Sequence, residues 1–405
     1  MRIVHFCDCF SPLSETFIYD HVSEVERQGA TCHVLTLERS NEETRPFDGV
    51  YTIPAPPRWN AGRLWRRSLA AFGKGTASGS YWPLLTPSLK EALVALAPDV
   101  IHAHFGPMGA LIAPLAQILG IPLVVSCYGY DVSVLIRKKA WRSEYRTLFN
   151  QATRLIGISN HICNKLIALG APPEKVHLMH LGIRPATFRF SSPQERFDGK
   201  TVRCLHVGRL VEKKDPIRLT QAIYHAQTLL GDTLTLQLQI AGDGPLRRKL
   251  EKTILDLGIQ DQVTLLGAVE HTEIPALMQS AHLYTQHCVT ARDGDQEGQG
   301  VSFVEASATG LPIVSTWHNG LPDVILHEET GFLVPEGHVR EMGDRIAALA
   351  SNPSLWTRLG QRGRAHVEAN FNLEKQVRRL IQLYEETLET YGKAQPALTV
   401  GHQTP

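Results

Sequence analysis

Short apolar runs alternate with amphipathic stretches along the first part of the chain, and this alternation limits the folds open to it. An apolar run at residues 2–10 is followed by an amphipathic stretch at 15–28 and a second apolar run at 32–37. The same order recurs at 100–105, 108–119 and 122–127, and further apolar runs lie at 155–159 and 176–181. Helical crossovers between buried strands join them in parallel with a right-handed turn. The pattern therefore predicts a parallel sheet covered by helices.

A second set of apolar runs predicts a second parallel sheet. Its strand candidates are residues 202–208, 235–242, 263–267, 283–287, 313–316 and 331–334, with helical patterns between most of them. The length of 405 residues exceeds what one hydrophobic core usually organises, which also favours two domains. The predicted fold class is α/β, with two Rossmann-like, doubly wound parallel-sheet domains that face each other across a cleft.

The domain boundaries follow from the stretch at 186–200, which has neither helical nor strand periodicity and is interpreted as a linker. It separates an N-terminal domain at 1–185 from a C-terminal domain at 201–372. A helical pattern at 373–391 is expected to pack back on the first domain. Residues 394–405 are expected to form a flexible tail.

The composition excludes several classes of function. Lys and Arg number 41 and Asp and Glu number 40, so no overall positive field would attract nucleic acid. No stretch reaches the roughly 20 apolar residues that cross a bilayer. The seven cysteines lack the spacing of a zinc site or a disulfide framework, which indicates free thiols in a reducing compartment. We therefore expect a cytoplasmic protein.

The run GRLVEKKD at 208–215 follows a predicted strand and precedes a helix. Gly208 lets a ligand approach the backbone, while Arg209 and Lys214 bring two cations to the same place. Together they could neutralise a departing diphosphate without a metal ion. The alternative is a solvated charge cluster at a helix start, and Lys213 is expected to remain solvated.

The run EGQGVSFVE at 297–305 places two glutamates around a helix start. Glu297 lies at the positive end of the helix and Glu305 about two turns further along. Backbone amides of Gly298, Gln299, Gly300 and Val301 would face phosphate, and the two carboxylates would face hydroxyl groups. A sugar nucleotide offers both kinds of group. The alternative is a capped helix with an ordinary surface glutamate.

These runs belong to a larger set whose order is more specific than any one motif. AGDGP at 241–245, LLGAV at 265–269, DGDQEGQGVSFVEASATGLPIVST at 293–316 and TGFLVP at 330–335 complete it. Residues 202–380 thereby resemble the nucleotide-binding half of glycosyltransferase family 4, retaining enzymes of the GT-B fold. The subfamily resemblance is to bacterial exopolysaccharide, lipopolysaccharide and colanic acid biosynthesis enzymes.

The resemblance implies a role for each of these positions. Glu297 would hold donor sugar hydroxyls and Glu305 the ribose, while Arg209 and Lys214 would grip the diphosphate. Gly267 would join the amides of the 298–301 segment as a donor-binding position. The donor would be a nucleotide diphosphate sugar, and the acceptor a saccharide or a lipid-linked saccharide. The departing phosphate itself would accept the acceptor proton, so Glu297, Arg209 and Lys214 act by positioning and charge.

Asp293-Gly294-Asp295 resembles a metal-binding pair. The family uses Arg and Lys at the diphosphate instead, so no metal and no cofactor is expected, and a loop turn is the preferred role of this segment.

The N-terminal half carries weaker parts of the resemblance, and its residues are assigned to an acceptor and sugar pocket. They are Glu15 in SETFI, His104 in IHAHFG, and Tyr128 and Asp131 in CYGYD. Many family members have His at the place of Tyr128, and a tyrosine there can only position the sugar. His104 is the candidate to orient the acceptor, the alternative being a structural histidine. Asp131 could instead cap the turn.

A basic and aromatic stretch at 58–74 could lie on an anionic membrane surface, which would suit a lipid-linked acceptor and a peripheral location. The alternative is an ordinary exposed helix. Two other functions stay open: a nucleotide-sugar epimerase of GT-B-like fold, and a degenerate transferase that acts as a binding module.

Overall fold

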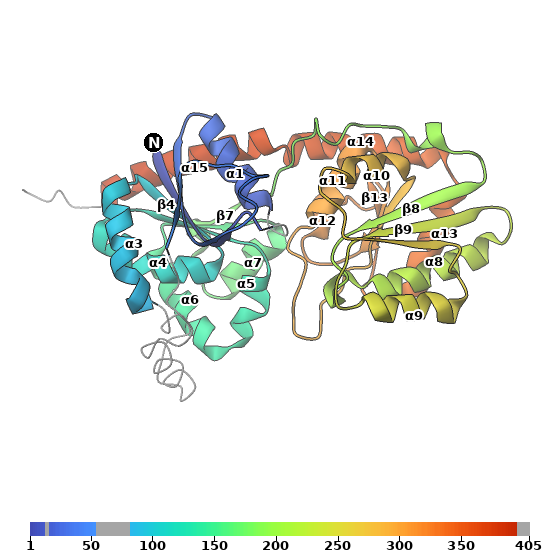
Figure 1. Cartoon of the computed structure of the whole chain (residues 1–405), viewed down its shortest axis with the longest axis horizontal. Helices are drawn as coiled ribbons and strands as arrows, with labels where there is room; N and C mark the ends of the chain where they lie inside the picture. The colour runs from blue at the N-terminus through green and yellow to red at the C-terminus, as the bar shows by residue number, and fades with distance from the viewer. Residues whose placement is uncertain (13–15, 54–81, 395–405) are drawn as a thin grey trace, which may run out of the picture. The chain divides into compact units, whose positions relative to one another are not determined.

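The computed structural model describes residues 1–12, 16–53 and 82–394, which form two compact units. Unit 1 comprises residues 1–157, 163–179 and the segment from Gln376 onward, and unit 2 comprises residues 158–162 and 180–375. Each unit has its own parallel sheet with helices packed on both faces (Figure 1). The prediction of two doubly wound parallel-sheet domains is confirmed.

The sheet of unit 1 has seven parallel strands in the order β3-β2-β1-β4-β5-β6-β7. They are β1 (Arg2–Phe10), β2 (Thr31–Arg39), β3 (Val50–Thr52), β4 (Val100–His104), β5 (Leu123–Cys127), β6 (Arg154–Gly157) and β7 (Val176–Leu178). Every residue of β4 and β5 is buried, as expected for strands that helices cover on both sides. The principal helices are α1 (Thr16–Arg27), α3 (Trp82–Leu96), α4 (Gly106–Leu119), α5 (Tyr130–Ser133), α6 (Lys139–Gln151) and α7 (Asn160–Ala168).

The sheet of unit 2 has six parallel strands in the order β10-β9-β8-β11-β12-β13. They are β8 (Thr201–Val207), β9 (Thr235–Ala241), β10 (Val263–Gly267), β11 (Leu283–Thr285), β12 (Ile313–Thr316) and β13 (Gly331–Val334). All six predicted strands are present. Its helices are α8 (Pro216–Leu230), α9 (Arg247–Leu257), α10 (Ile274–Ser280), α11 (Val301–Thr309), α12 (Leu321–Val324), α13 (Val339–Ala350) and α14 (Ser354–Asn370). The last helix, α15 (Leu373–Ala394), belongs to unit 1 from Gln376 onward.

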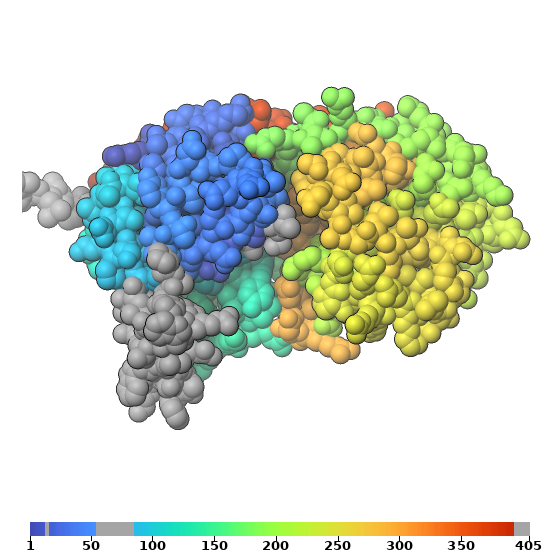
Figure 2. Space-filling view, viewed as in Figure 1, coloured from blue at the N-terminus to red at the C-terminus, as the bar shows by residue number. Residues whose placement is uncertain are grey.

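Two hydrophobic cores hold the sheet of unit 2 between its helices. One joins the strands to α8, α9 and α13 through residues such as Leu219 and Ile346, and the other joins them to α10, α11 and α14 through Met278 and Phe303. Figure 1 shows these two groups of helices on opposite faces of β8 and β9. Side chains fill the spaces between the ribbons within each unit (Figure 2).

The strand order reverses between β1 and β4 in unit 1 and between β8 and β11 in unit 2. At such a switch point the neighbouring connections leave in opposite directions, so ligands of open α/β sheets bind beyond the carboxyl ends of these strands. In unit 2 the segments that follow β8 and β11 are the two motif-bearing segments of the sequence. Across residues 1–12, 16–53 and 82–394, none of the helices has the length and apolar character needed to span a membrane.

Candidate functional site

A buried ion pair joins the two motif segments of unit 2. Lys214 ends a short 3-10 turn after β8, and Glu297 lies in the segment between β11 and α11. The Nζ atom of Lys214 is 2.8 Å from Oε2 of Glu297, and the two side chains are only 11% and 15% exposed. The structure therefore brings together the cation and the carboxylate that the sequence predicted for one site.

The two partners hold each other in their charged forms. Burial alone would raise the pKa of Glu297, but the charges of Lys214 and Lys213 outweigh it and lower that pKa to about 2. Burial would lower the pKa of Lys214, yet the charge of Glu297 raises it above its ordinary value. The site thus keeps a positive and a negative group side by side at neutral pH, ready to bind groups of opposite charge.

Arg209 and Gly208 lie at the same end of β8. Arg209 is exposed, and its positive charge opposes the protonation of Lys214, which places the two cations within electrostatic range. A Cβ atom on Gly208 would lie 3.8 Å from the Lys214 stem. Two cationic side chains, Arg209 and Lys214, therefore lie near the backbone of Gly208, where the sequence predicts a phosphate site.

A close approach between glycine segments builds the floor of the site. Gly242, with φ of +151°, packs so closely that a Cβ atom would lie 1.9 Å from the carbonyl oxygen of Gly208. Its amide donates to the carbonyl of Gly267, which ends β10 at a φ of +74°. Only glycine tolerates such a conformation and contact. The AGDGP motif thus packs against the start of the 208–215 segment.

The second predicted glutamate has a partner that the sequence did not suggest. Glu305 in α11 is 5% exposed, and its Oε1 atom is 2.9 Å from Nε2 of His271, which lies between β10 and α10. Helix α11 begins at Val301, directly after Gly300 at a φ of +81°. Gln299 has its side-chain amide hydrogen-bonded to both backbone groups of Leu181, at 2.8 and 2.9 Å. The Gln299 side chain is therefore hydrogen-bonded to another residue of unit 2.

Two expectations for this region have different outcomes. The expectation that Lys213 stays solvated is wrong, because its Nζ is 3.2 Å from Oδ1 of Asp295 and its side chain is 12% exposed. The turn at Asp293-Gly294-Asp295 is present: the amide of Asp295 donates to Asp293 at 2.9 Å, and Gly294 has a φ of +89°. The carboxylate of Asp295 thus neutralises Lys213.

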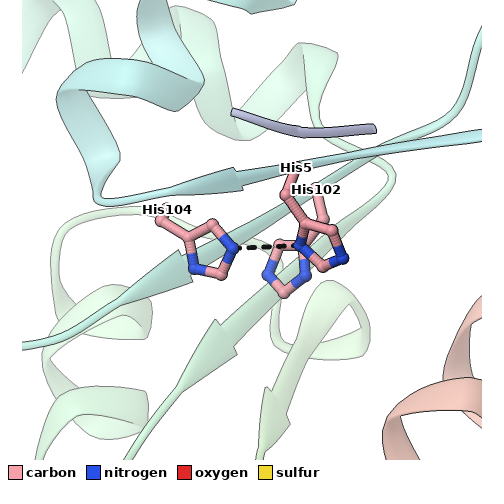
Figure 3. A group of neighbouring side chains, drawn as sticks. All are labelled: His5, His102 and His104. Carbon is pink, nitrogen blue, oxygen red and sulfur yellow. Dashed lines mark hydrogen bonds between the residues drawn. The ribbon is translucent and has the colours of Figure 1, made fainter. Parts of the chain in front are cut away.

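In unit 1 the predicted residue His104 belongs to a buried histidine cluster, formed with His5 and His102 (Figure 3). Nδ1 of His104 is 2.6 Å from the hydroxyl of Tyr128, and its Nε2 is 3.1 Å from Nδ1 of His5. Burial, followed by the neighbouring histidines, holds the pKa of His104 well below its usual value. His104 is therefore neutral and fully buried, and it contacts Tyr128 directly.

One ring nitrogen from each of the three histidines lies within 4.8 Å of the other two, a spacing that a metal site could also show. His102 contacts Tyr384 and Ser126 through its two nitrogens, at 2.6 and 2.8 Å. The rings of His102 and His104 are stacked, with centroids 4.5 Å apart and an interplanar angle of 25°. Ligand rings instead point their nitrogens at a shared centre. The cluster therefore fits a neutral hydrogen-bonded network better than a metal site.

Asp131 caps backbone groups in unit 1. Its side chain is 1% exposed and accepts hydrogen bonds from the amides of Gly106, Tyr128 and Gly129, at 3.1, 3.1 and 2.8 Å. Burial raises the pKa of its carboxyl despite these three donors. Of the two roles considered for Asp131, the geometry favours the turn cap. Glu15 and the stretch at 58–74 lie outside the described residues.

A cavity of about 330 Å³ lies at the switch point of unit 1. Its lining comes from the end of β1 and from the segments that follow β1, β4 and β5: Asp8, Cys9, Pro12, Phe105, Pro107, Met108, Tyr130, Asp131 and Leu135. Burial, and then the charge of Glu38, raises the pKa of Asp8. Asp8 could not be recognised from the sequence, because a single acid inside an apolar strand gives no pattern.

Two doubly wound parallel-sheet units in one chain define the GT-B fold of glycosyltransferases. A solved structure, the Anabaena protein HepE in complex with UDP, matches this chain with a TM-score of 0.74 at 17% sequence identity. The match covers 95% of this chain and 100% of HepE. At this level of identity the likeness shows the shared fold.

Two family models match consecutive parts of the chain and identify its family. The model described as Glycosyltransferase Family 4 matches residues 14–187, and the model described as Glycosyl transferases group 1 matches residues 187–366. D-inositol 3-phosphate glycosyltransferase 1 of Catenulispora acidiphila is 30% identical over 327 residues, 74% of each chain. The amylovoran biosynthesis glycosyltransferase AmsK of Erwinia amylovora is 29% identical over 409 residues, 95% of this chain and 99% of AmsK. The chain belongs to the family 4 glycosyltransferases and is a glycosyltransferase.

Proposed function

We propose that the protein is a retaining enzyme that moves a sugar from a nucleotide diphosphate sugar to a saccharide or lipid-linked acceptor in bacterial surface polysaccharide biosynthesis. The Lys214–Glu297 ion pair at the switch point of unit 2 is the observation that carries the proposal. It offers a cation for phosphate and a carboxylate for sugar hydroxyls, 2.8 Å apart. A full-length relationship to AmsK supports the biosynthetic role.

The proposed reaction breaks the bond between the anomeric carbon of the donor sugar and its phosphate oxygen. Arg209 and Lys214 stabilise the negative charge that develops on the departing diphosphate. Glu297 orients the sugar through its hydroxyls, and Glu305 binds the ribose. The acceptor oxygen bonds to the anomeric carbon on the face that the phosphate leaves, and the acceptor proton passes to the departing phosphate oxygen. Configuration is retained, and no protein base is required.

The cavity of unit 1 is the proposed acceptor site. Phe105 and Tyr130 give it aromatic surface, and Asp8 gives it an exposed carboxyl. Apolar and aromatic faces with a few placed polar groups are typical of small-ligand sites. His104 and Tyr128 lie in the interior of the same unit, and we propose that they support this site.

A donor screen tests the proposal. Thermal unfolding would be followed with UDP, GDP and their glucose, galactose and mannose derivatives, because a ligand that binds only the folded protein raises Tm. The stabilising donor would then be incubated with lipid-linked saccharides, and the anomeric configuration of the product determined by NMR. We expect one nucleotide class to raise Tm and the product to retain the donor configuration. An inverted product, or an isomerised donor formed without acceptor, would exclude this function.

Transfer is expected to proceed without a divalent metal ion. Arg209 and Lys214 already provide two positive charges where a metal would bind the diphosphate, so a chelator has nothing essential to remove. Rates measured after dialysis against EDTA should equal those in added Mg²⁺ or Mn²⁺. A loss of activity that Mn²⁺ alone restores would contradict this prediction.

A further inference from the structure

His318 is a fully buried histidine that touches the backbone of Glu297. It follows β12, in the short segment before α12, and is 0% exposed. The amide of Glu297 donates a hydrogen bond to its Nε2 atom at 3.0 Å. On the other side of the ring, Nδ1 is 2.5 Å from Oε1 of Glu336. One side chain thus connects the segment that carries Glu297 to Glu336, the second residue after β13.

These contacts determine where the ring carries its proton. A backbone amide can only donate, so Nε2 of His318 must present its lone pair to Glu297. The side-chain amide nitrogen of Asn319 also lies 2.9 Å from Nε2, which is consistent with the same lone pair. A neutral ring then carries its hydrogen on Nδ1 and donates it to the Glu336 carboxylate. The carboxylate selects the tautomer that can accept from Glu297.

Glu336 fixes the same segment at a second point. Its Oε2 atom accepts a hydrogen bond from the amide of Thr290 at 2.9 Å. Burial alone would raise the pKa of Glu336, but the hydrogen bonds from His318 and Thr290 outweigh it, and the pKa is lowered. The carboxylate therefore stays ionised and holds both Thr290 and, through His318, Glu297.

The segment around Glu297 is also held from the other side. A Cβ atom on Gly320 would lie 1.9 Å from the carbonyl oxygen of Gly298, so the backbone after His318 packs directly on the backbone after Glu297. The Glu297 carboxylate itself is held by Lys214. Its direction is consequently set by Lys214 at the carboxylate and by His318 at the amide.

We propose that His318, held by Glu336 in its Nδ1–H form, is a positioning residue that orients Glu297 toward the donor sugar. This inference rests on the proposed role of Glu297 in sugar binding. Misplacing a positioned group by about 1 Å costs on the order of 100-fold in rate. His318 acts on the sugar-binding carboxylate and leaves the diphosphate cations untouched, so its loss should lower kcat much more than nucleotide affinity.

The test compares His318→Leu, which removes both hydrogen bonds, with His318→Gln, whose amide oxygen can still accept from Glu297. His338→Ala is the matched control, because His338 is exposed and its ring pairs with Glu341. Thermal unfolding confirms that each variant folds. Steady-state transfer is measured with the donor found in the screen, and binding of the free nucleotide diphosphate by calorimetry.

We expect His318→Leu to lower kcat by roughly 10- to 100-fold with nucleotide affinity within about 3-fold of wild type, and His318→Gln to recover most of that loss. Wild-type turnover in His318→Leu would overturn the inference. So would a folded His318→Gln that is as slow as His318→Leu, or a nucleotide affinity that falls in parallel with kcat.

A measurement that needs no activity separates this inference from the proposed function. ¹⁵N spectra of histidine-labelled protein distinguish the two ring tautomers, and the His318→Gln spectrum assigns the His318 signals. We expect the Nδ1–H form, and an Nε2–H form would overturn the inference whatever the enzyme does. A wild type that transfers no sugar from any donor, but shows the Nδ1–H form, would count against the proposed function alone.

Discussion

Replacing Lys214 by Ala, or Glu297 by Gln, is expected to lower the rate of sugar transfer by at least ~100-fold, which is about 2.7 kcal/mol of transition-state stabilisation. In the proposed reaction, Lys214 supplies charge to the departing diphosphate and Glu297 holds the sugar in place. Since each keeps the other ionised, loss of either one also weakens its partner. Initial rates of transfer at saturating donor and acceptor measure the effect.

The control for this pair is Lys252→Ala, which removes an exposed lysine of the same unit that pairs with Asp256. It should leave the rate unchanged. Wild-type turnover in both Lys214→Ala and Glu297→Gln would refute their roles. A double variant that is no slower than either single variant would show that the two residues act as one unit.

The Lys214–Glu297 ion pair should also be detectable in the pH dependence of stability, when wild type is compared with Lys214→Ala. Glu297 has a pKa of about 2 in the folded protein and an ordinary value of 4.5, so its ionised form stabilises the fold above about pH 4.5. That contribution is lost as the pH falls toward 2. The difference in Tm between wild type and Lys214→Ala should therefore be largest near neutral pH and shrink in acid.

Replacing Asp131 by Ala is expected to destabilise the protein by about 3 kcal/mol or more. The change leaves three buried amides of the 106–129 region without an acceptor, and each such loss costs roughly 1–3 kcal/mol. For a domain of this size that corresponds to a fall in Tm of about 6–12 °C. Circular dichroism during heating measures it.

Two further variants make the Asp131 prediction specific. Asp131→Asn keeps one acceptor oxygen and avoids burying a charge, so it should cost clearly less than Asp131→Ala. Asp48→Ala removes an exposed carboxylate of the same unit and should change Tm by no more than about 1 °C. A small effect of Asp131→Ala, similar to that of Asp48→Ala, would show that the three amides find other partners.

The strands of unit 2 could be predicted almost residue by residue, because buried parallel strands form short apolar runs separated by helical periods. The predicted run at 313–316 and the observed β12 have the same bounds. The predicted run at 283–287 extends two residues beyond β11, which ends at Thr285. Gln286 and His287 are still buried although regular strand pairing ends at Thr285. The predicted run therefore matches the buried segment more closely than the strand itself.

The candidate site was predictable where it rests on local motifs and not where it rests on tertiary contacts. Lys214 and Glu297 stand in recognisable segments, and the structure brings them together. Lys213 was misjudged because its partner Asp295 is distant in the sequence. His318 and Glu336 were missed for the same reason. A single histidine after a strand shows no pattern in the sequence, and its role can be inferred only when its contact with the Glu297 segment is known.

The division of the chain has a practical consequence for working with its parts. Unit 1 is discontinuous, because Gln376 onward belongs to it although residues 180–375 do not. The hydroxyl of Tyr384 in α15 lies 2.6 Å from His102 in the core of unit 1. In a fragment that stops near residue 185, the imidazole of His102 would therefore lose its hydrogen-bond partner Tyr384. The apolar surface of unit 1 that α15 covers would also become exposed to water. Isolating the N-terminal half as a stable protein requires the C-terminal helix to be supplied with it, either as a separate peptide or through an engineered fusion.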